Sequence, residues 1–256
     1  MEESMVLTGP TFTSRVRGPA IIALVGALAA VLCVLAIFLA GMGNRSGWWD
    51  YRGALTILRW AAWIGPVAAV VAALGGTLSM PGRPPRRVTV FAIVGVVLGT
   101  LVFAVPWAYT SRDAPPINDI TTDTANPPRF VDVLPLRRSA PVRTDYGGDA
   151  VAAIQHKAYP DIAPARLPVA PAQAFERALD AARSLGWDIV AAVPAEGRIE
   201  ATDTTRFMGF KDDVVIRVTP DGAGSRVDVR SLSRVGGGDF GTNAGRIRAF
   251  LKRLRP

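Results

Sequence analysis

The sequence predicts an α+β protein in which three N-terminal transmembrane helices precede a soluble αββββα domain, with an antiparallel sheet covered by two helices. Two observations predict this fold class: apolar stretches long enough to cross a bilayer, and helical then alternating periodicity after residue 171. The expected parts are a cytoplasmic N-terminus (residues 1–18), a three-helix transmembrane region (19–110), a proline-rich extended segment (111–170) and an α+β periplasmic domain (171–256).

Three apolar stretches, residues 19–42, 54–80 and 88–109, each reach the roughly 20 residues that a helix needs to cross a bilayer. The first is longer than the roughly 7–15 apolar residues of a secretory signal, so it predicts an uncleaved anchor. It contains Cys33, the only cysteine, which we interpret as an apolar filler. The lipid bilayer is therefore the first expected partner.

The arginines predict the orientation in the membrane. Arg15 and Arg17 precede the first stretch, and residues 82–87 between the second and third contain three arginines and no acid. Short cytoplasmic loops are rich in such residues. The other loop, residues 44–52, places Trp48, Trp49 and Tyr51 at an expected headgroup depth. We therefore expect a bacterial inner (plasma) membrane protein with its C-terminal domain in the periplasm.

Small residues in the spans predict close helix packing. Gly95 and Gly99 form a GxxxG in the third stretch, and the second carries glycine and alanine at four-residue spacing. The alternative is a docking face for another membrane protein. Arg59 lies near the start of the second stretch, and we expect its side chain to reach the outer interface.

Residues 111–171 are rich in proline and polar side chains, with proline pairs at 115–116 and 127–128. Such a stretch is not expected to hold long helices. Apolar residues such as Ile117 and Phe130 interrupt it, so we expect it to wrap along the domain rather than form a free tether. The sequence leaves open which face of the sheet it crosses.

The C-terminal domain shows the periodicity of one helix, four strands and a second helix. Phe175, Leu179 and Ala182 fall on one face of a helix that Gly186 is placed to end. Alternating residues separated by turn signals predict an antiparallel meander, and two helices should cover one of its faces. The expected strands are residues 187–193, 198–204, 212–219 and 226–232, and the last helix is residues 241–254.

Several strings of this region resemble the domain of unknown function 1499 (DUF1499) family, found in bacterial membrane proteins and in plants. The resemblance implies that the extended segment and the αββββα core form one unit, and that attachment to membrane helices is a familiar arrangement. It brings no settled activity and no catalytic residues. The strings are residues 115–123, 159–162, 186–187, 198–202, 210–218 and 241–247.

His156 and three aspartates are the candidate catalytic or ligand-binding residues. His156 is the only histidine, and neither a G-x-S-x-G motif nor a second histidine accompanies it, so a surface or packing role is favoured. Asp212 and Asp213 are adjacent, so in a strand they point to opposite faces. We expect these two and Asp203 at a solvated strand end rather than around a cation.

Basic side chains form a second candidate set. Arg206, Lys211 and Arg217, together with Arg230 and Arg234, could line a surface for an acidic ligand on the exposed sheet face. Cross-strand pairing with Glu200, Asp203 and Asp228 is the alternative. Residues 236–241 spell GxGxxG, but the strand before them belongs to an antiparallel meander, so no dinucleotide site is expected. No cofactor and no metal are predicted.

Much of the formal charge of +8 lies in the arginines of the short loops, and the absence of a contiguous basic stripe argues against nucleic acid binding. The sequence favours an accessory or scaffold protein, not an enzyme, whose periplasmic domain binds a membrane or periplasmic protein or a lipid. One alternative is a membrane-surface enzyme, which requires Asp203, Asp212, Asp213 and His156 to converge in a pocket. The other is a lipid- or ligand-shuttling component with an apolar cavity.

Overall fold

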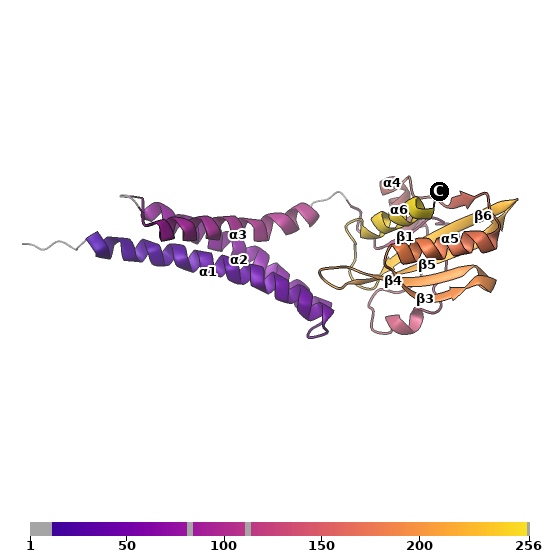
Figure 1. Cartoon of the computed structure of the whole chain (residues 1–256), viewed down its shortest axis with the longest axis horizontal. Helices are drawn as coiled ribbons and strands as arrows, with labels where there is room; N and C mark the ends of the chain where they lie inside the picture. Colours follow the sequence, from indigo (N-terminus) through magenta and orange to yellow (C-terminus); the bar gives the residue numbers. More distant parts are fainter. Residues whose placement is uncertain (1–11, 81–83, 111–113, 255–256) are drawn as a thin grey trace, which may run out of the picture. The chain divides into compact units, whose positions relative to one another are not determined.

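The computed structural model describes residues 12–80, 84–110 and 114–254. The chain divides into two compact units, Met1–Ser111 and Arg112–Pro256, which are described separately (Figure 1). The described residues of the first unit form three long helices, and the second unit contains a sheet with helices. The predicted fold class, three long apolar helices followed by an α+β domain, is confirmed.

The first unit consists of α1 (Phe12–Arg45), α2 (Tyr51–Leu78) and α3 (Arg86–Thr110). Stretches of 29, 28 and 23 residues within them are long and apolar enough to cross a membrane, which indicates a membrane location. Asp50 caps α2, since its carboxylate accepts a hydrogen bond of 2.9 Å from the N–H of Gly53.

Glycines let the three helices approach closely. A Cβ atom on Gly26 of α1 would overlap the backbone of Ala72 in α2, and one on Gly75 of α2 would overlap Ala23. Gly99 of α3 lies in the same way against Gly65 of α2. The small residues at four-residue spacing are therefore used for packing within the bundle.

The second unit is built on an antiparallel sheet of six strands in the order β1-β6-β5-β4-β3, with β2 also paired to β6. The four predicted strands form its central meander. Two three-residue strands from the proline-rich segment, which the sequence did not predict, add to the edge of β6. The strands are β1 (Asp119–Thr121), β2 (Ala165–Leu167), β3 (Asp188–Val193), β4 (Arg198–Thr204), β5 (Lys211–Asp221) and β6 (Gly224–Ser233), with the 3₁₀ turn η2 (Pro194–Glu196) after β3.

Helices α5 (Pro171–Ser184) and α6 (Thr242–Leu254) pack on one face of this sheet, as predicted. The ring of Trp187 stacks on that of Phe250 with centroids 5.6 Å apart. Burying these apolar side chains supplies most of the driving force for the domain. The core between helices and sheet includes Phe175, Leu179, Val214, Ile216, Val229 and Ile247.

The other sheet face is covered by residues 122–147, which include the 3₁₀ turn η1 (Leu134–Arg137). The carboxylate of Glu200 in β4 accepts hydrogen bonds from the N–H groups of Val131 (2.8 Å) and Val133 (2.9 Å). A small apolar cluster adds to this contact. The expectation of an exposed sheet face was therefore wrong, because the proline-rich segment lies across it.

The proline-rich segment also contains α4 (Gly148–Ala158), which the sequence did not predict. No proline occurs between Pro141 and Pro160, so the local sequence permits a helix of 11 residues. Its buried Gln155 accepts a hydrogen bond from Thr121 N–H (3.0 Å) and donates one to the Thr121 carbonyl (2.7 Å). The side chain thus pairs with the outer edge of β1 as a neighbouring strand would.

Candidate functional site

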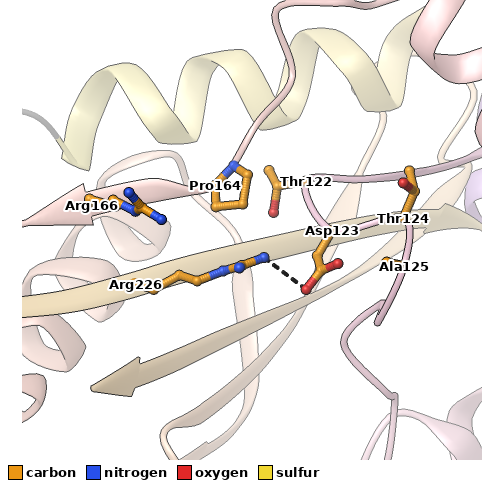
Figure 2. A pocket seen from close by; sticks show the side chains of 7 residues that line it. All are labelled: Thr122, Asp123, Thr124, Ala125, Pro164, Arg166 and Arg226. Atoms are coloured by element: carbon orange, nitrogen blue, oxygen red, sulfur yellow. Dashed lines mark hydrogen bonds and ion pairs between the residues drawn. The ribbon is translucent and has the colours of Figure 1, made fainter. Parts of the chain in front are cut away.

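A pocket opens along one edge of β6, where the two short strands meet. β1 pairs with residues 230–232 of β6 and β2 with residues 225–227, while β5 occupies the opposite edge. The pocket has a volume of about 510 Å³, within the range of roughly 300–1,000 Å³ of small-molecule sites. Its lining, seen in Figure 2, consists of Thr122, Asp123, Thr124, Ala125, Pro164, Arg166 and Arg226.

Two arginines stand directly opposite each other in this pocket. Arg166 of β2 is the register partner of Arg226 of β6, so both side chains lie on one face of the sheet. Like charges in such a pair repel. Arg226 is held by Asp123 and Asp228, whereas the side chain of Arg166 is 78% exposed and forms an ion pair with Asp221 at 3.0 Å.

Carboxylates beneath the pocket fix the position of Arg226. Asp123 Oδ2 accepts hydrogen bonds from Arg217 (2.9 Å) and Arg226 (2.8 Å), and Asp228 accepts from the same two arginines. Hydrogen bonding to Asp228 raises the pKa of Arg226 above its ordinary value, so its guanidinium stays charged. Within the described residues, Nη1 of Arg226 donates no hydrogen bond, which leaves it available to an anionic ligand.

The turn after β1 shapes the pocket wall. Asp123 Oδ1 accepts a hydrogen bond of 2.9 Å from the N–H of Asn126, which closes an Asx turn. Thr124 Oγ1 lies 3.0 Å from Nε2 of the exposed His156 on α4. The only histidine therefore stands beside the pocket wall and contacts it through Thr124, without lining the pocket itself.

One protein family accounts for this part of the chain. A family model described as "Protein of unknown function (DUF1499)" matches residues 119–254, more than half of the sequence. The chain belongs to the DUF1499 family. The match runs from β1 to α6, so the DUF1499 domain includes the residues that line the pocket. No curated protein and no solved structure matches the chain.

Asp203 and Asp212 lie on the helix side of the DUF1499 domain. They are direct partners in the register of β4 and β5. Both bind Arg246 of α6, with Nε 2.7 Å from Asp203 and Nη2 2.6 Å from Asp212. Arg246 Nη1 also donates to Ser231 Oγ at 3.1 Å. These two acids are therefore used to hold α6 against the sheet.

Asp213 lies on the opposite face, as the strand alternation predicted. Its carboxylate binds Arg137 (2.5 Å) and Arg234 (2.8 Å) and accepts a hydrogen bond from Thr202. The expected solvated strand end is wrong, because Asp213 is 0% and Asp212 only 4% exposed. Burial tends to raise the pKa of Asp213, but hydrogen bonds from Arg234, Thr202 and Arg137 outweigh it, so the pKa is lowered.

The basic candidates also separate. Arg206 and Lys211, at the turn between β4 and β5, are exposed. Arg217 binds Asp123 and Asp228, the two carboxylates that also hold Arg226 at the pocket. Arg217 stands opposite Asp228 in the register of β5 and β6, so this cross-strand pair is confirmed. Arg230, by contrast, is buried and binds Asp119. The four arginines and one lysine therefore do not form one ligand surface.

The GxGxxG string leads into α6 without forming a phosphate cradle. The carboxylate of Asp239 accepts hydrogen bonds from the N–H groups of Gly241 (2.8 Å) and Asn243 (2.6 Å), so this helix end is occupied by the protein's own acid. Burial raises the pKa of Asp239, although these hydrogen bonds oppose it. Across residues 12–80, 84–110 and 114–254, no group of three acidic, histidine or cysteine side chains could hold a metal ion.

The sequence alone does not reveal the pocket. Arg166 and Arg226 meet only because β2 pairs with β6, and β2 is too short to show a periodic pattern. Asp123 gave one signal, since it ends the string 115–123 that carries the family resemblance.

Proposed function

We propose that the protein is a membrane-anchored accessory protein whose periplasmic DUF1499 domain binds the acidic group of a protein or lipid partner in the arginine-lined pocket. One observation carries this proposal: Arg166 and Arg226 stand opposite each other at a pocket. Guanidinium groups recognise carboxylates and phosphates in two-point geometry.

The periplasmic location rests on the arginine distribution. Residues 82–87 join α2 to α3 and carry three arginines, which favours the cytoplasm for this loop. An odd number of spans then puts the two chain ends on opposite sides of the membrane. The DUF1499 domain follows the third span and is accordingly assigned to the periplasm.

An enzymatic role receives less support from the geometry. The hypothesis requires Asp203, Asp212, Asp213 and His156 to converge, yet they lie in three separate surroundings. The carboxylate that lines the pocket, Asp123, is bound by two arginines. A general acid or base must be free to exchange a proton with substrate. Binding therefore fits the pocket better than catalysis.

A lipid-shuttling role would require an apolar cavity large enough for an acyl chain. The pocket at β6 is lined instead by arginines, an aspartate and threonines, with one proline and one alanine. This composition suits a charged headgroup or an acidic side chain rather than a hydrocarbon chain.

Charge reversal at Arg166 tests the proposal. Full-length protein would be extracted in native lipid discs and its bound proteins and lipids identified by mass spectrometry. We expect Arg166→Glu to reduce the amount of a co-purified stoichiometric partner at least tenfold, because glutamate would repel its acidic group. The side chain of Arg166 is exposed, so the change should not disturb the core. Arg183→Glu, the same change on an exposed arginine of α5, is the matched control and should retain the partner.

Equal retention by Arg166→Glu and wild type would contradict a role for the pocket. Equal loss from both glutamate variants would show a general charge effect and would contradict it as well.

A further inference from the structure

The first part of α2 has a polar face where a lipid-embedded helix should be apolar. Arg52, Thr56, Arg59 and Trp63 follow one another at spacings of four, three and four residues, so they share one side of the helix, and all four are exposed. The apolar 18-residue window of α2 has a mean hydropathy of 1.8, against 3.1 for that of α1 and 2.7 for that of α3. Two arginines facing the hydrocarbon core would be costly.

Helix packing shows which residues lie at the same level. Gly26 packs on Ala72 and Gly75 on Ala23, so residue 60 of α2 lies level with residue 38 of α1. Gly99 packs on Gly65 and Gly95 on Ala72, so residue 60 also lies level with residues 104–107 of α3. Exposed aromatic side chains occupy this level on all three helices: Phe38, Trp60, Phe103 and Trp107.

The helix segments between this aromatic level and the opposite ends of the bundle are as long as the hydrocarbon core of a bilayer is thick. At 1.5 Å per residue, Arg17 to Phe38 spans about 32 Å, Trp60 to Leu78 about 27 Å, and Arg87 to Trp107 about 30 Å. A hydrocarbon core is about 30 Å thick. Three helices therefore place the membrane boundary at the same height, with arginines at the far ends of α1 and α3.

We infer that Arg59 and the aromatic residues Phe38, Trp60 and Trp107 form an interfacial belt that binds the phosphate and glycerol layer of the bilayer. The hairpin beyond it, residues 39–58, stands in water. Arginine pairs with lipid phosphate, and indole rings favour this layer. The inference depends on membrane insertion and not on the ligand pocket.

The belt is separate from Trp48 and Trp49, which lie in the loop between α1 and α2. Trp49 donates a hydrogen bond of 3.2 Å to the carbonyl of Ala40 and packs against Gly43. It closes the hairpin between α1 and α2. From Trp60 to Asp50 the hairpin extends about 15 Å beyond the belt.

Cysteine labelling tests the position of the boundary. In a Cys33→Ala background, single cysteines replace Leu55 or Thr56 above the belt and Val67 or Val70 below it. All four side chains are exposed on the protein, at 46% for Leu55, 62% for Val67 and 58% for Val70, so protein burial does not separate them. The full chain is placed in nanodiscs of phosphatidylcholine and phosphatidylglycerol and treated with a water-soluble maleimide.

We expect L55C and T56C to react at least tenfold faster than V67C and V70C, and all four to react alike in dodecyl sulfate. Equal protection of L55C and V70C in nanodiscs would overturn the inference. Arg59→Leu tests the arginine itself: it should lower the labelling of T56C several-fold, whereas Arg59→Lys should not. Unchanged labelling of T56C in the leucine variant would exclude Arg59 from the belt.

Discussion

At the scale of single residues, Gln155 completes the edge of the sheet. Its amide satisfies both backbone groups of Thr121 in a fully buried setting. We expect Gln155→Ala to destabilise this edge by about 2–4 kcal/mol, because each unsatisfied buried group costs about 1–3 kcal/mol. Amide hydrogen exchange of residues 117–125 is the measurement, and it should become faster by a factor of ten or more.

Gln173→Ala, an exposed glutamine of α5, is the matched control and should leave that exchange unchanged. Wild-type exchange in Gln155→Ala would show that the glutamine does not hold β1.

Asp213 provides a pH-dependent prediction. Replacing it by asparagine leaves Arg137 and Arg234 without their buried counter-ion, so the domain should lose about 3–5 kcal/mol at pH 7. The pKa of Asp213 is lowered in the folded state. Its stabilisation is therefore present above the unfolded pKa of about 3.9 and is lost as the pH falls through the folded value.

The wild type should accordingly approach Asp213→Asn in stability only as the solution becomes more acidic than about pH 4. The urea concentration at which β5 amides lose exchange protection measures this difference. Asp145→Asn, which removes one partner of an exposed ion pair, should change the stability of the domain by less than about 1 kcal/mol. If the difference in stability between wild type and Asp213→Asn stayed the same from pH 7 to below about pH 4, the role of the carboxylate charge would be contradicted.

Alternation along the strand was enough to predict that Asp212 and Asp213 diverge. It could not predict that Asp213 is buried, because Arg137 comes from η1 and that turn's position depends on tertiary packing. The pocket arginines show the same limit. Arg166 and Arg226 are distant in sequence, and only strand pairing brings them together.

Among the elements, Arg230 of β6 joins several parts of the proline-rich segment to the sheet. Arg230 binds both carboxylate oxygens of Asp119 (2.9 and 2.7 Å) and donates to the carbonyls of Pro128 (3.1 Å) and Thr144 (2.7 Å). Its guanidinium also lies 5.6 Å from the ring centroid of Tyr146. Burial and the charge of Asp119 raise the pKa of Tyr146 to about 12, although Arg230 opposes them.

Arg230→Lys should loosen this segment selectively. Lysine keeps the charge but cannot reproduce the planar set of donors, so we expect a loss of about 2 kcal/mol or more. Hydrogen exchange of residues 128–146 should rise at least tenfold while α5 and α6 remain protected.

Arg183→Lys, on the exposed face of α5, is the control and should change neither region. A uniform increase over the whole domain in Arg230→Lys would show that the arginine supports the core rather than the segment.

The long elements were predictable and the short ones were not. The bounds expected for β4 agree with the structure, because seven alternating residues between turns give a clear signal. β1 and β2 have three residues each and show no period. α4 was missed because the proline content of the whole segment concealed a proline-free stretch. The face that this segment covers depends on Glu200 and Arg230. From the sequence alone, the charges of these two residues predict exposed positions rather than buried ones.

At the scale of the whole molecule, the orientation in the membrane is the main prediction. Alkaline phosphatase fused after Pro256 should be active, because this reporter folds only outside the cytoplasm. The same enzyme inserted after Pro84, between α2 and α3, should be inactive. The opposite pattern would place the DUF1499 domain in the cytoplasm and would remove the periplasmic assignment.

Site-specific photocrosslinking in cells would show whether the DUF1499 domain binds a partner at the arginine-lined pocket. A photoreactive phenylalanine would replace Ala125, an exposed residue of the pocket lining, or Gln173, an exposed residue of α5. We expect one dominant adduct, a protein or a lipid, from position 125 and none from position 173. No adduct from position 125, or the same products from both positions, would contradict it.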